Sequence, residues 1–186
     1  GYTGLVSLGH AAFLGIGAYT HSYFLSLGLP FVFSLSISVF FSSFIGMLLA
    51  IPALRVTGIY LAVATLAFSI IVEQILSHWV SVTGGYRGML VPDPNIGSLS
   101  LKSHTAFYFV CLTFFSSSVL IGLNILRSPV GRAMTAVRDS EISAQSMGIN
   151  LAKTKTIAFA ISAGFTGLAG GLLAHKIGYL APDSFN

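Results

Sequence analysis

The composition of the 186-residue sequence excludes an ordinary soluble domain. Hydrophobic residues make up 54% of the sequence and charged residues only 8%, the mean hydropathy is +0.87, and the formal net charge is +4. Soluble domains carry about 25% charged residues, so these few charges cannot supply the polar surface that a dissolved globule of this size needs. The sequence therefore predicts a protein that is integral to a membrane.

Uncharged segments follow one another along the chain. The first 54 residues carry no Lys, Arg, Asp or Glu, and the turn residues Gly28 and Pro30 divide them into two. We expect spans at about residues 5–26, 31–52, 57–77, 105–126 and 156–176. Each is close to the roughly 20 residues that cross a bilayer core of about 30 Å as a helix. The sequence thus predicts an all-α integral membrane protein, a polytopic bundle of about five transmembrane helices.

The basic residues are concentrated between the fourth and fifth expected spans. Five of the nine lie there, namely Arg127, Arg132, Arg138, Lys153 and Lys155. Because basic residues collect on the cytoplasmic side of membrane proteins, the 127–155 loop is expected to be cytoplasmic. Alternation then places the 79–104 loop outside and the link that contains Arg55 inside, which agrees with the same rule. A nucleic-acid partner is disfavoured, because aromatic residues are not interleaved with the basic ones.

The 127–155 loop carries the signals of two short helices. Ser128 followed by Pro129 is a favourable helix start. Asp139 or Ser140 can cap a second helix, and Gly148 is placed to end it in a left-handed conformation. These helices are expected to present small apolar contacts beside the basic residues, namely Ala133, Met134, Val137, Ala144 and Met147. Such contacts favour a docking surface for a soluble partner over a solvated loop.

Small residues recur every four positions in the first and last expected spans. They are Ser7, Ala11 and Gly15 in one span, and Ala163, Gly167 and Gly171 in the other. A face of small residues lets helix backbones approach closely inside a bilayer. Close packing is therefore favoured over a glycine-induced bend in the last span.

Candidates for chemistry are few. Glu73 is the one acidic residue within a span, and its position near the outer interface favours a partly hydrated carboxylate over a substrate or proton site. The five histidines are His10, His21, His78, His104 and His175. None lies three or four residues from another with a carboxylate nearby, so packing histidines are favoured over a metal site. Cys111 lies in an apolar run and is expected to be a packing residue. No protease signature and no phosphate-binding Gly-x-x-x-x-Gly-Lys loop occurs.

Several blocks of sequence resemble one family. Ala144-x-x-x-Gly148 after an acidic residue resembles the cytoplasmic EAA-type loop of ABC importer permeases, although Glu141 stands one position earlier than the strict spacing requires. Four blocks resemble the branched-chain amino acid permeases of these importers, and the LivM-type subunit more than the LivH-type. They are residues 4–19, residues 55–68, Thr83-Gly84-Gly85, and the stretch from Gly131 to Ala163.

The resemblance implies an ATP-driven importer of branched-chain or related small amino acids in the inner membrane. Residues 1–186 would be a partial permease domain, with an N-terminal helix and the last helices of the family outside it. The chain would have no enzymatic activity and no cofactor. The implied partners are cytoplasmic ATPase subunits, a second permease subunit in a heterodimer, and an extracytoplasmic solute-binding protein. The implied coupling residues are Arg132, Arg138, Asp139, Glu141, Ala144 and Gly148.

Two alternatives stay open. A permease of this kind could carry urea, amides or another small solute. A self-sufficient secondary transporter would need ionisable side chains facing a cavity in mid-membrane, which this sequence almost lacks.

Overall fold

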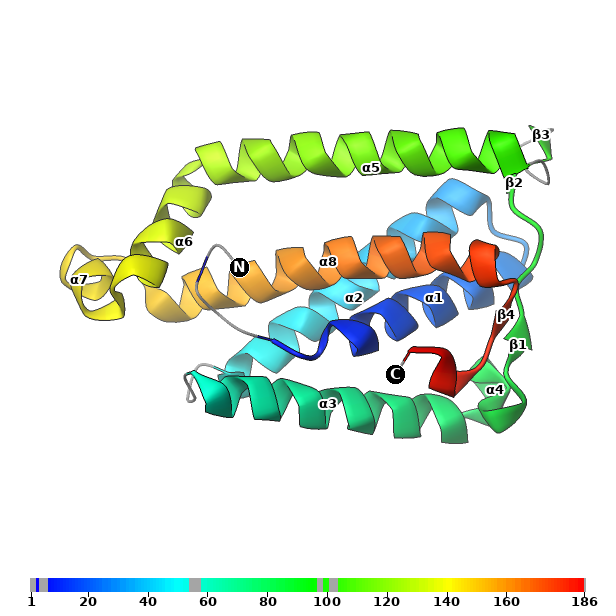
Figure 1. Ribbon diagram of the computed structural model, residues 1–186, viewed down its shortest axis with the longest axis horizontal. Coiled ribbons are helices and arrows are strands. Elements are labelled where there is room, and N and C mark those ends of the chain that lie inside the picture. Colours follow the sequence, from blue (N-terminus) through cyan, green and yellow to red (C-terminus); the bar gives the residue numbers. More distant parts are fainter. Residues whose placement is uncertain (1–2, 4–6, 54–57, 97–98, 101–103, 186) are drawn as a thin grey trace.

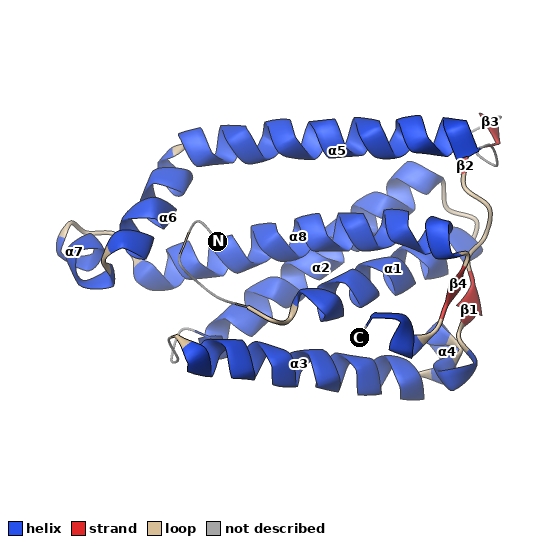
Figure 2. Ribbon diagram, in the orientation of Figure 1, coloured by secondary structure: helices blue, strands red, loops and turns tan. Residues whose placement is uncertain are grey.

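Long helices dominate the computed structural model, which describes residues 3, 7–53, 58–96, 99–100 and 104–185 (Figures 1 and 2). The five long helices are α1 (His10–Ser26), α2 (Phe31–Ala53), α3 (Ile59–His78), α5 (His104–Arg127) and α8 (Leu151–Ile177). The shorter helices are α4 (Val80–Thr83), η1 (Gly85–Arg87), α6 (Pro129–Asp139), α7 (Glu141–Ser146) and η2 (Pro182–Phe185). The two-residue strands are β1 (Met89–Leu90), β2 (Asn95–Ile96), β3 (Leu99–Ser100) and β4 (Tyr179–Leu180). The predicted all-α bundle is confirmed.

Four helices in the described residues are long and apolar enough to cross a membrane: α2, α3, α5 and α8. The first expected span differs, because α1 begins at His10 and has 17 residues. At 1.5 Å per residue it is about 26 Å long, slightly less than a hydrocarbon core of about 30 Å. The last span also differs. Since Asn150 accepts a hydrogen bond from the Lys153 backbone N–H at 2.9 Å, α8 begins at Leu151 rather than near residue 156.

The core of the bundle lies where α8 meets α1 and α2. A Cβ atom on Gly17 of α1 would collide with the backbone of Gly167 of α8, and one on Gly170 would collide with the Leu14 carbonyl. Ala163, Gly167 and Gly171 are all buried in this contact. The predicted close packing of small residues is therefore confirmed for α8, which runs as one unbroken helix.

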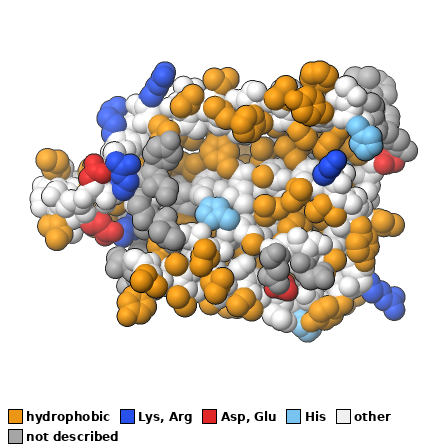
Figure 3. Space-filling model, viewed as in Figure 1, with side chains coloured by type: hydrophobic (Ala, Val, Ile, Leu, Met, Phe, Trp, Pro, Cys, Tyr) orange, Lys and Arg blue, Asp and Glu red, His pale blue; other side chains and the backbone are white. Residues whose placement is uncertain are grey.

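α5 stands apart from this core. It lies beside α8 in Figure 1, and none of its residues, all of which the structure describes, is buried. Many of its apolar side chains are exposed, as are many on α2 and α3, so hydrophobic atoms cover much of the surface in Figure 3. A lipid environment satisfies such a surface, whereas water does not. These helices and this surface make the chain a multi-pass membrane protein.

The two ends of the bundle are built differently. Successive long helices run in opposite directions, as the alternation of spans predicts (Figure 1). At one end, α6 and α7 form a protruding elbow. At the other end, β1 pairs antiparallel with β4, and Phe185 of η2 packs edge-on against Tyr19 of α1. The described residues of the 79–104 loop form the short helices α4 and η1 and the two-residue strands β1, β2 and β3. Residues 54–57, including Arg55 of the expected inner link, lie outside the described residues.

Candidate functional site

The elbow of α6 and α7 is held by side-chain caps at each helix start. The Ser128 hydroxyl accepts a hydrogen bond from the Gly131 backbone N–H at 3.4 Å, with Pro129 in the first turn of α6. The Ser140 hydroxyl accepts one from the Ser143 backbone N–H at 3.2 Å and starts α7. Ser140 therefore both ends α6 and caps α7, so the chain turns sharply at a single extended residue. The two predicted helices are confirmed.

The apolar side chains expected to face a partner are mostly buried inside the chain. Met134, Val137 and Ala144 are buried, and Ala133 is half-buried. The prediction of a docking surface is therefore wrong for the three buried residues, and for Ala133 it stays a prediction. The physical reason is that α6 is amphipathic and packs its apolar face on the neighbouring ends of α5 and α8, while Ala144 lies on α7, which contacts α8.

Two other apolar side chains form the exposed tip of the elbow. Ile142 is 80% exposed and Met147 is 82% exposed. Met147 was among the expected contacts, whereas Ile142 was missed. Its signal in the sequence is a β-branched apolar residue in a short helix that is otherwise small and polar, Glu141–Ser146. An exposed apolar pair on a projecting turn is typical of a docking element, because contact between apolar side chains and water is unfavourable and a partner that covers them removes it.

An ion pair fastens this elbow to α8. The Lys155 Nζ atom lies 2.8 Å from one Glu141 carboxylate oxygen and donates a hydrogen bond to the other at 2.9 Å. The Lys155 side chain is only 4% exposed, and that of Glu141 is 41% exposed. Lys155 was assigned to the loop by sequence, yet it lies in the second turn of α8 and points at α7. Glu141, one of the predicted coupling residues, is therefore a structural link between α7 and a membrane-spanning helix.

The remaining charged residues of the predicted coupling set lie on the surface of α6. Arg132 is exposed and donates to the Arg127 carbonyl at 3.1 Å. Arg138 donates to Asp139 Oδ1 from two of its nitrogens, at 2.9 and 3.0 Å. The side chains of this pair are 44% and 63% exposed, so both stay accessible to a partner. The structure thus brings the six predicted residues onto one elbow, with Ala144 beneath the surface.

Gly148 ends α7 as predicted, in the left-handed region at φ +82°. The Gly148 N–H bonds to the Gln145 carbonyl and the Ile149 N–H to the Ala144 carbonyl, both at 3.0 Å. This is the Schellman arrangement, in which a residue with positive φ follows the helix. Among the described residues no atom lies within 4 Å of a Cβ built on Gly148, so only backbone conformation restricts the position.

The destabilisation caused by a substitution at Gly148 is accordingly expected to depend on how well the new residue tolerates positive φ, and not on its size. Gly148→Val should destabilise the end of α7 by about 1–2 kcal/mol, because a β-branched residue tolerates positive φ poorly. Gly148→Asn should cost less, since asparagine adopts this conformation more readily. Protease sensitivity of the elbow in the full-length protein measures the difference. Equal sensitivity of the two variants would contradict a conformational role for Gly148.

Other polar groups lie inside the bundle. The His21 ring nitrogens lie 2.8 Å from His175 Nε2 and 2.9 Å from Ser34 Oγ, which joins α1, α8 and α2. Glu73 is half-buried and lines a small crevice with Gly15 and Phe185. The described residues contain no group of three or more His, Cys, Asp or Glu side chains that could hold a metal ion. The His21 link was not predicted, because its partners are far apart in the sequence.

Comparison with known proteins places the chain in a family. The family model described as "Branched-chain amino acid transport system / permease component" matches residues 1–186. The chain is 35% identical over 214 aligned residues to the protein of Salmonella typhimurium named "High-affinity branched-chain amino acid transport system permease protein LivM", covering all of this chain and 49% of that protein.

Two further relatives carry similar names. The chain is 35% identical to the protein of the same name from Escherichia coli, again over the whole chain and 49% of the relative. It is 25% identical over 69% of its length to 37% of a "Probable branched-chain amino acid transport permease protein LivM" of Methanocaldococcus jannaschii. No solved structure matches the chain significantly.

The chain spans about half the length of the first two relatives. The family model nevertheless matches it from end to end, and the apolar helices agree with a permease. The chain therefore belongs to the family of permease components of branched-chain amino acid transport systems, and within it is similar to the LivM proteins.

Proposed function

We propose that this chain is part of the membrane permease subunit of an ATP-driven importer for branched-chain amino acids in the inner membrane. The family match supports a transport permease, and the names of the relatives supply the substrate class. In this proposal ATP is hydrolysed by separate cytoplasmic ATPase subunits. A second permease subunit completes the membrane part, and an extracytoplasmic protein delivers the amino acid.

The observation that carries this proposal is the exposed tip of the α6–α7 elbow together with its ion pair to α8. Ile142 and Met147 give a partner an apolar contact, and Arg132 and Arg138 give it cationic groups nearby. The Lys155–Glu141 pair fixes α7 to a helix that crosses the membrane. A movement of the tip would therefore move α8 as well, because the Lys155 side chain that holds Glu141 is buried in the packing of α8 and cannot shift independently.

Motion of α8 would in turn act on the rest of the bundle. The glycine face of α8 packs directly against the backbone of α1 and against short side chains of α2 such as Ser42 and Ser43, so little space is left to absorb a displacement. In this proposal the elbow faces the cytoplasm, in agreement with the basic residues of the 127–155 segment. ATP-driven closure of the ATPase subunits would then rock α8 and its neighbours as one unit and alternate access across the membrane.

A charge placed at the tip tests this docking role. Ile142→Asp in the full-length protein should lower ATP-dependent isoleucine uptake at least about tenfold, because it puts an unpaired carboxylate into an apolar contact. Ser143→Asp is the matched control, since it adds the same charge one residue away, near the favourable N-terminal end of α7. Both variants should reach the membrane in normal amounts. Full uptake by Ile142→Asp would show that the elbow is not the surface on which the ATPase subunits act.

A further inference from the structure

A cavity of about 390 Å³ lies between α5 and the central bundle, on the half of the molecule that carries the elbow. It is lined from the start of α1, the last turns of α5, α6 and the first half of α8, and Figure 3 shows the recess beside α5. Pockets that bind small molecules begin at about 300 Å³, so this cavity has room for a ligand at the small end of that range.

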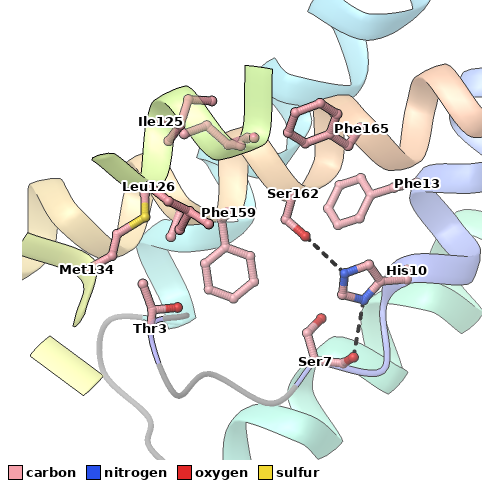
Figure 4. A pocket seen from close by; sticks show the side chains of 13 residues that line it. Thr3, Ser7, His10, Phe13, Ile125, Leu126, Met134, Phe159, Ser162 and Phe165 are labelled. Atoms are coloured by element: carbon pink, nitrogen blue, oxygen red, sulfur yellow. Dashed lines mark hydrogen bonds between the residues drawn. The ribbon is translucent and has the colours of Figure 1, made fainter. Parts of the chain in front are cut away.

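The cavity has a polar side and an apolar side. Figure 4 shows Ser7, His10 and Ser162 together on one side, while Ile125, Leu126 and Met134 lie across from them. Phe13, Phe159 and Phe165 add aromatic walls. A ligand that fits both sides must itself have a compact polar end and an apolar end.

The hydrogen bonds on the polar side fix which groups can bind a ligand. His10 Nδ1 lies 3.2 Å from the Ser7 carbonyl, which can only accept, so Nδ1 carries the proton. In the neutral ring Nε2 then accepts from the Ser162 hydroxyl, 3.0 Å away. The Ser162 oxygen keeps lone pairs that can accept from an ammonium group, and the hydroxyls of Ser7 and Thr3 can donate to a carboxylate.

The lining also selects by charge. The lining residues that the structure describes include no Asp, Glu, Lys or Arg. A solute with a net charge would lose its hydration there without a counter-charge, which is costly in a membrane interior. A zwitterion has no net charge and can satisfy both of its ends with the hydroxyl groups of Ser7 and Ser162, two residues that His10 holds in place. Urea or a simple amide would leave the apolar side unfilled.

We propose that this cavity is a binding site for the transported amino acid, with its ammonium group at Ser162, its carboxylate at Ser7, and its branched side chain against Ile125, Leu126 and Met134. The inference rests on the proposed function and adds a place for the substrate. It also connects that place to the elbow, because Met134 belongs to α6. A shift of α6 therefore changes the wall of the site directly.

Protection of a cysteine tests the site in the full-length complex. Ser162→Cys is made in a background in which Cys111 and any cysteine elsewhere in the full-length protein are replaced, and its rate of modification by a small methanethiosulfonate reagent is measured. L-Isoleucine at about ten times its Kd should slow the reaction about tenfold by occupying the cavity. L-Lysine at the same concentration should not slow it. Ser184→Cys, exposed in η2 outside the long helices, is the control and should be modified at the same rate with and without isoleucine.

Two outcomes would overturn the inference. One is modification of Ser162→Cys at the same rate with and without isoleucine. The other is no modification at all, which would mean that another segment of the full-length protein or a lipid chain fills the cavity. Failure of the proposed function is a separate result, since it would appear as absent isoleucine uptake by the wild-type complex.

A second variant tests the apolar side through specificity. Ile125→Trp narrows that side and should lower isoleucine uptake about tenfold more than valine uptake, since a missing methylene is worth that much in a tight pocket. Valine uptake shows that the variant is assembled. An equal fall for both amino acids, or no fall for either, would contradict the placement of the side chain.

Discussion

Replacement of Gly17 by leucine is expected to remove most of the folded protein from the membrane. Gly17 and Gly167 bring the backbones of α1 and α8 into direct contact, so a Cβ at residue 17 has no space. The obstacle is backbone, which cannot rotate away as a side chain can. Overpacking of a tight core costs about 1–3 kcal/mol or more, and here α1 must move away from α8.

The measurement for Gly17→Leu is the amount and thermal stability of the full-length protein in detergent. Gly122→Leu is a matched control, because among the described residues no atom lies within 4 Å of a Cβ built on Gly122. Leucine is also the better helix former, so the control should be as stable as the wild type or slightly more so. Equal stability of Gly17→Leu and Gly122→Leu would show that α1 and α8 do not pack in this way.

Removal of the Glu141 carboxylate is expected to have the largest effect among changes in the elbow. Glu141→Ala leaves the Lys155 ammonium buried without its partner, and loss of one member of a buried pair costs about 3–5 kcal/mol. Because Glu141 is partly exposed, the lower end of that range applies. α7 should detach from α8, and ATP-dependent uptake should fall at least about tenfold while the bundle stays folded.

Substitution of the other member of the pair, Lys155, should destabilise the contact between α7 and α8 less than Glu141→Ala does. This difference between the two variants identifies Lys155 as the buried partner. In Lys155→Met an apolar chain of similar length fills the space, and the Glu141 carboxylate can reach water. We therefore expect α7 to be attached to α8 in a larger fraction of the molecules in Lys155→Met than in Glu141→Ala. Protease sensitivity between α6 and α8, measured with uptake, separates the two variants.

The exposed pair on the neighbouring helix is the control for this effect. Asp139→Ala breaks a pair whose members are both well exposed, and such pairs contribute about 0–1 kcal/mol. Its thermal stability should match the wild type. A loss of stability as large as that of Glu141→Ala would mean that burial of Lys155 is not the cause.

The sequence was sufficient to predict α2, α3, α5 and α8 as spans, because length and apolar composition decide which segments can cross a bilayer, whereas the first expected span is the shorter helix α1. It also predicted the small face of α8, since small residues four apart on a helix permit close approach whichever helix comes near. On α1 the close contact with α8 is made by Gly17, which the predicted set of Ser7, Ala11 and Gly15 does not contain.

The start of α8 was misplaced for a local reason. Lys153 and Lys155 looked like loop residues, yet the Asn150 cap extends the helix and Glu141 neutralises Lys155.

The site was harder to predict, because its features depend on contacts between distant segments. An amphipathic helix such as α6 shows an apolar face, but its sequence does not say whether that face meets its own chain or a partner. Met134 and Val137 therefore looked available and are buried. The contact between His10 and Ser162 joins residues 152 positions apart, so no local spacing could indicate it.

The most direct test of the account is isoleucine uptake by the full-length protein reconstituted with its second permease subunit and the solute-binding protein, with the ATPase subunits present or omitted. Uptake against a concentration gradient should require both ATP and the ATPase subunits, and Ile142→Asp should lower it at least about tenfold even when they are present. Uptake of the same size without the ATPase subunits would contradict the account, because the chain would then transport without a partner at its elbow.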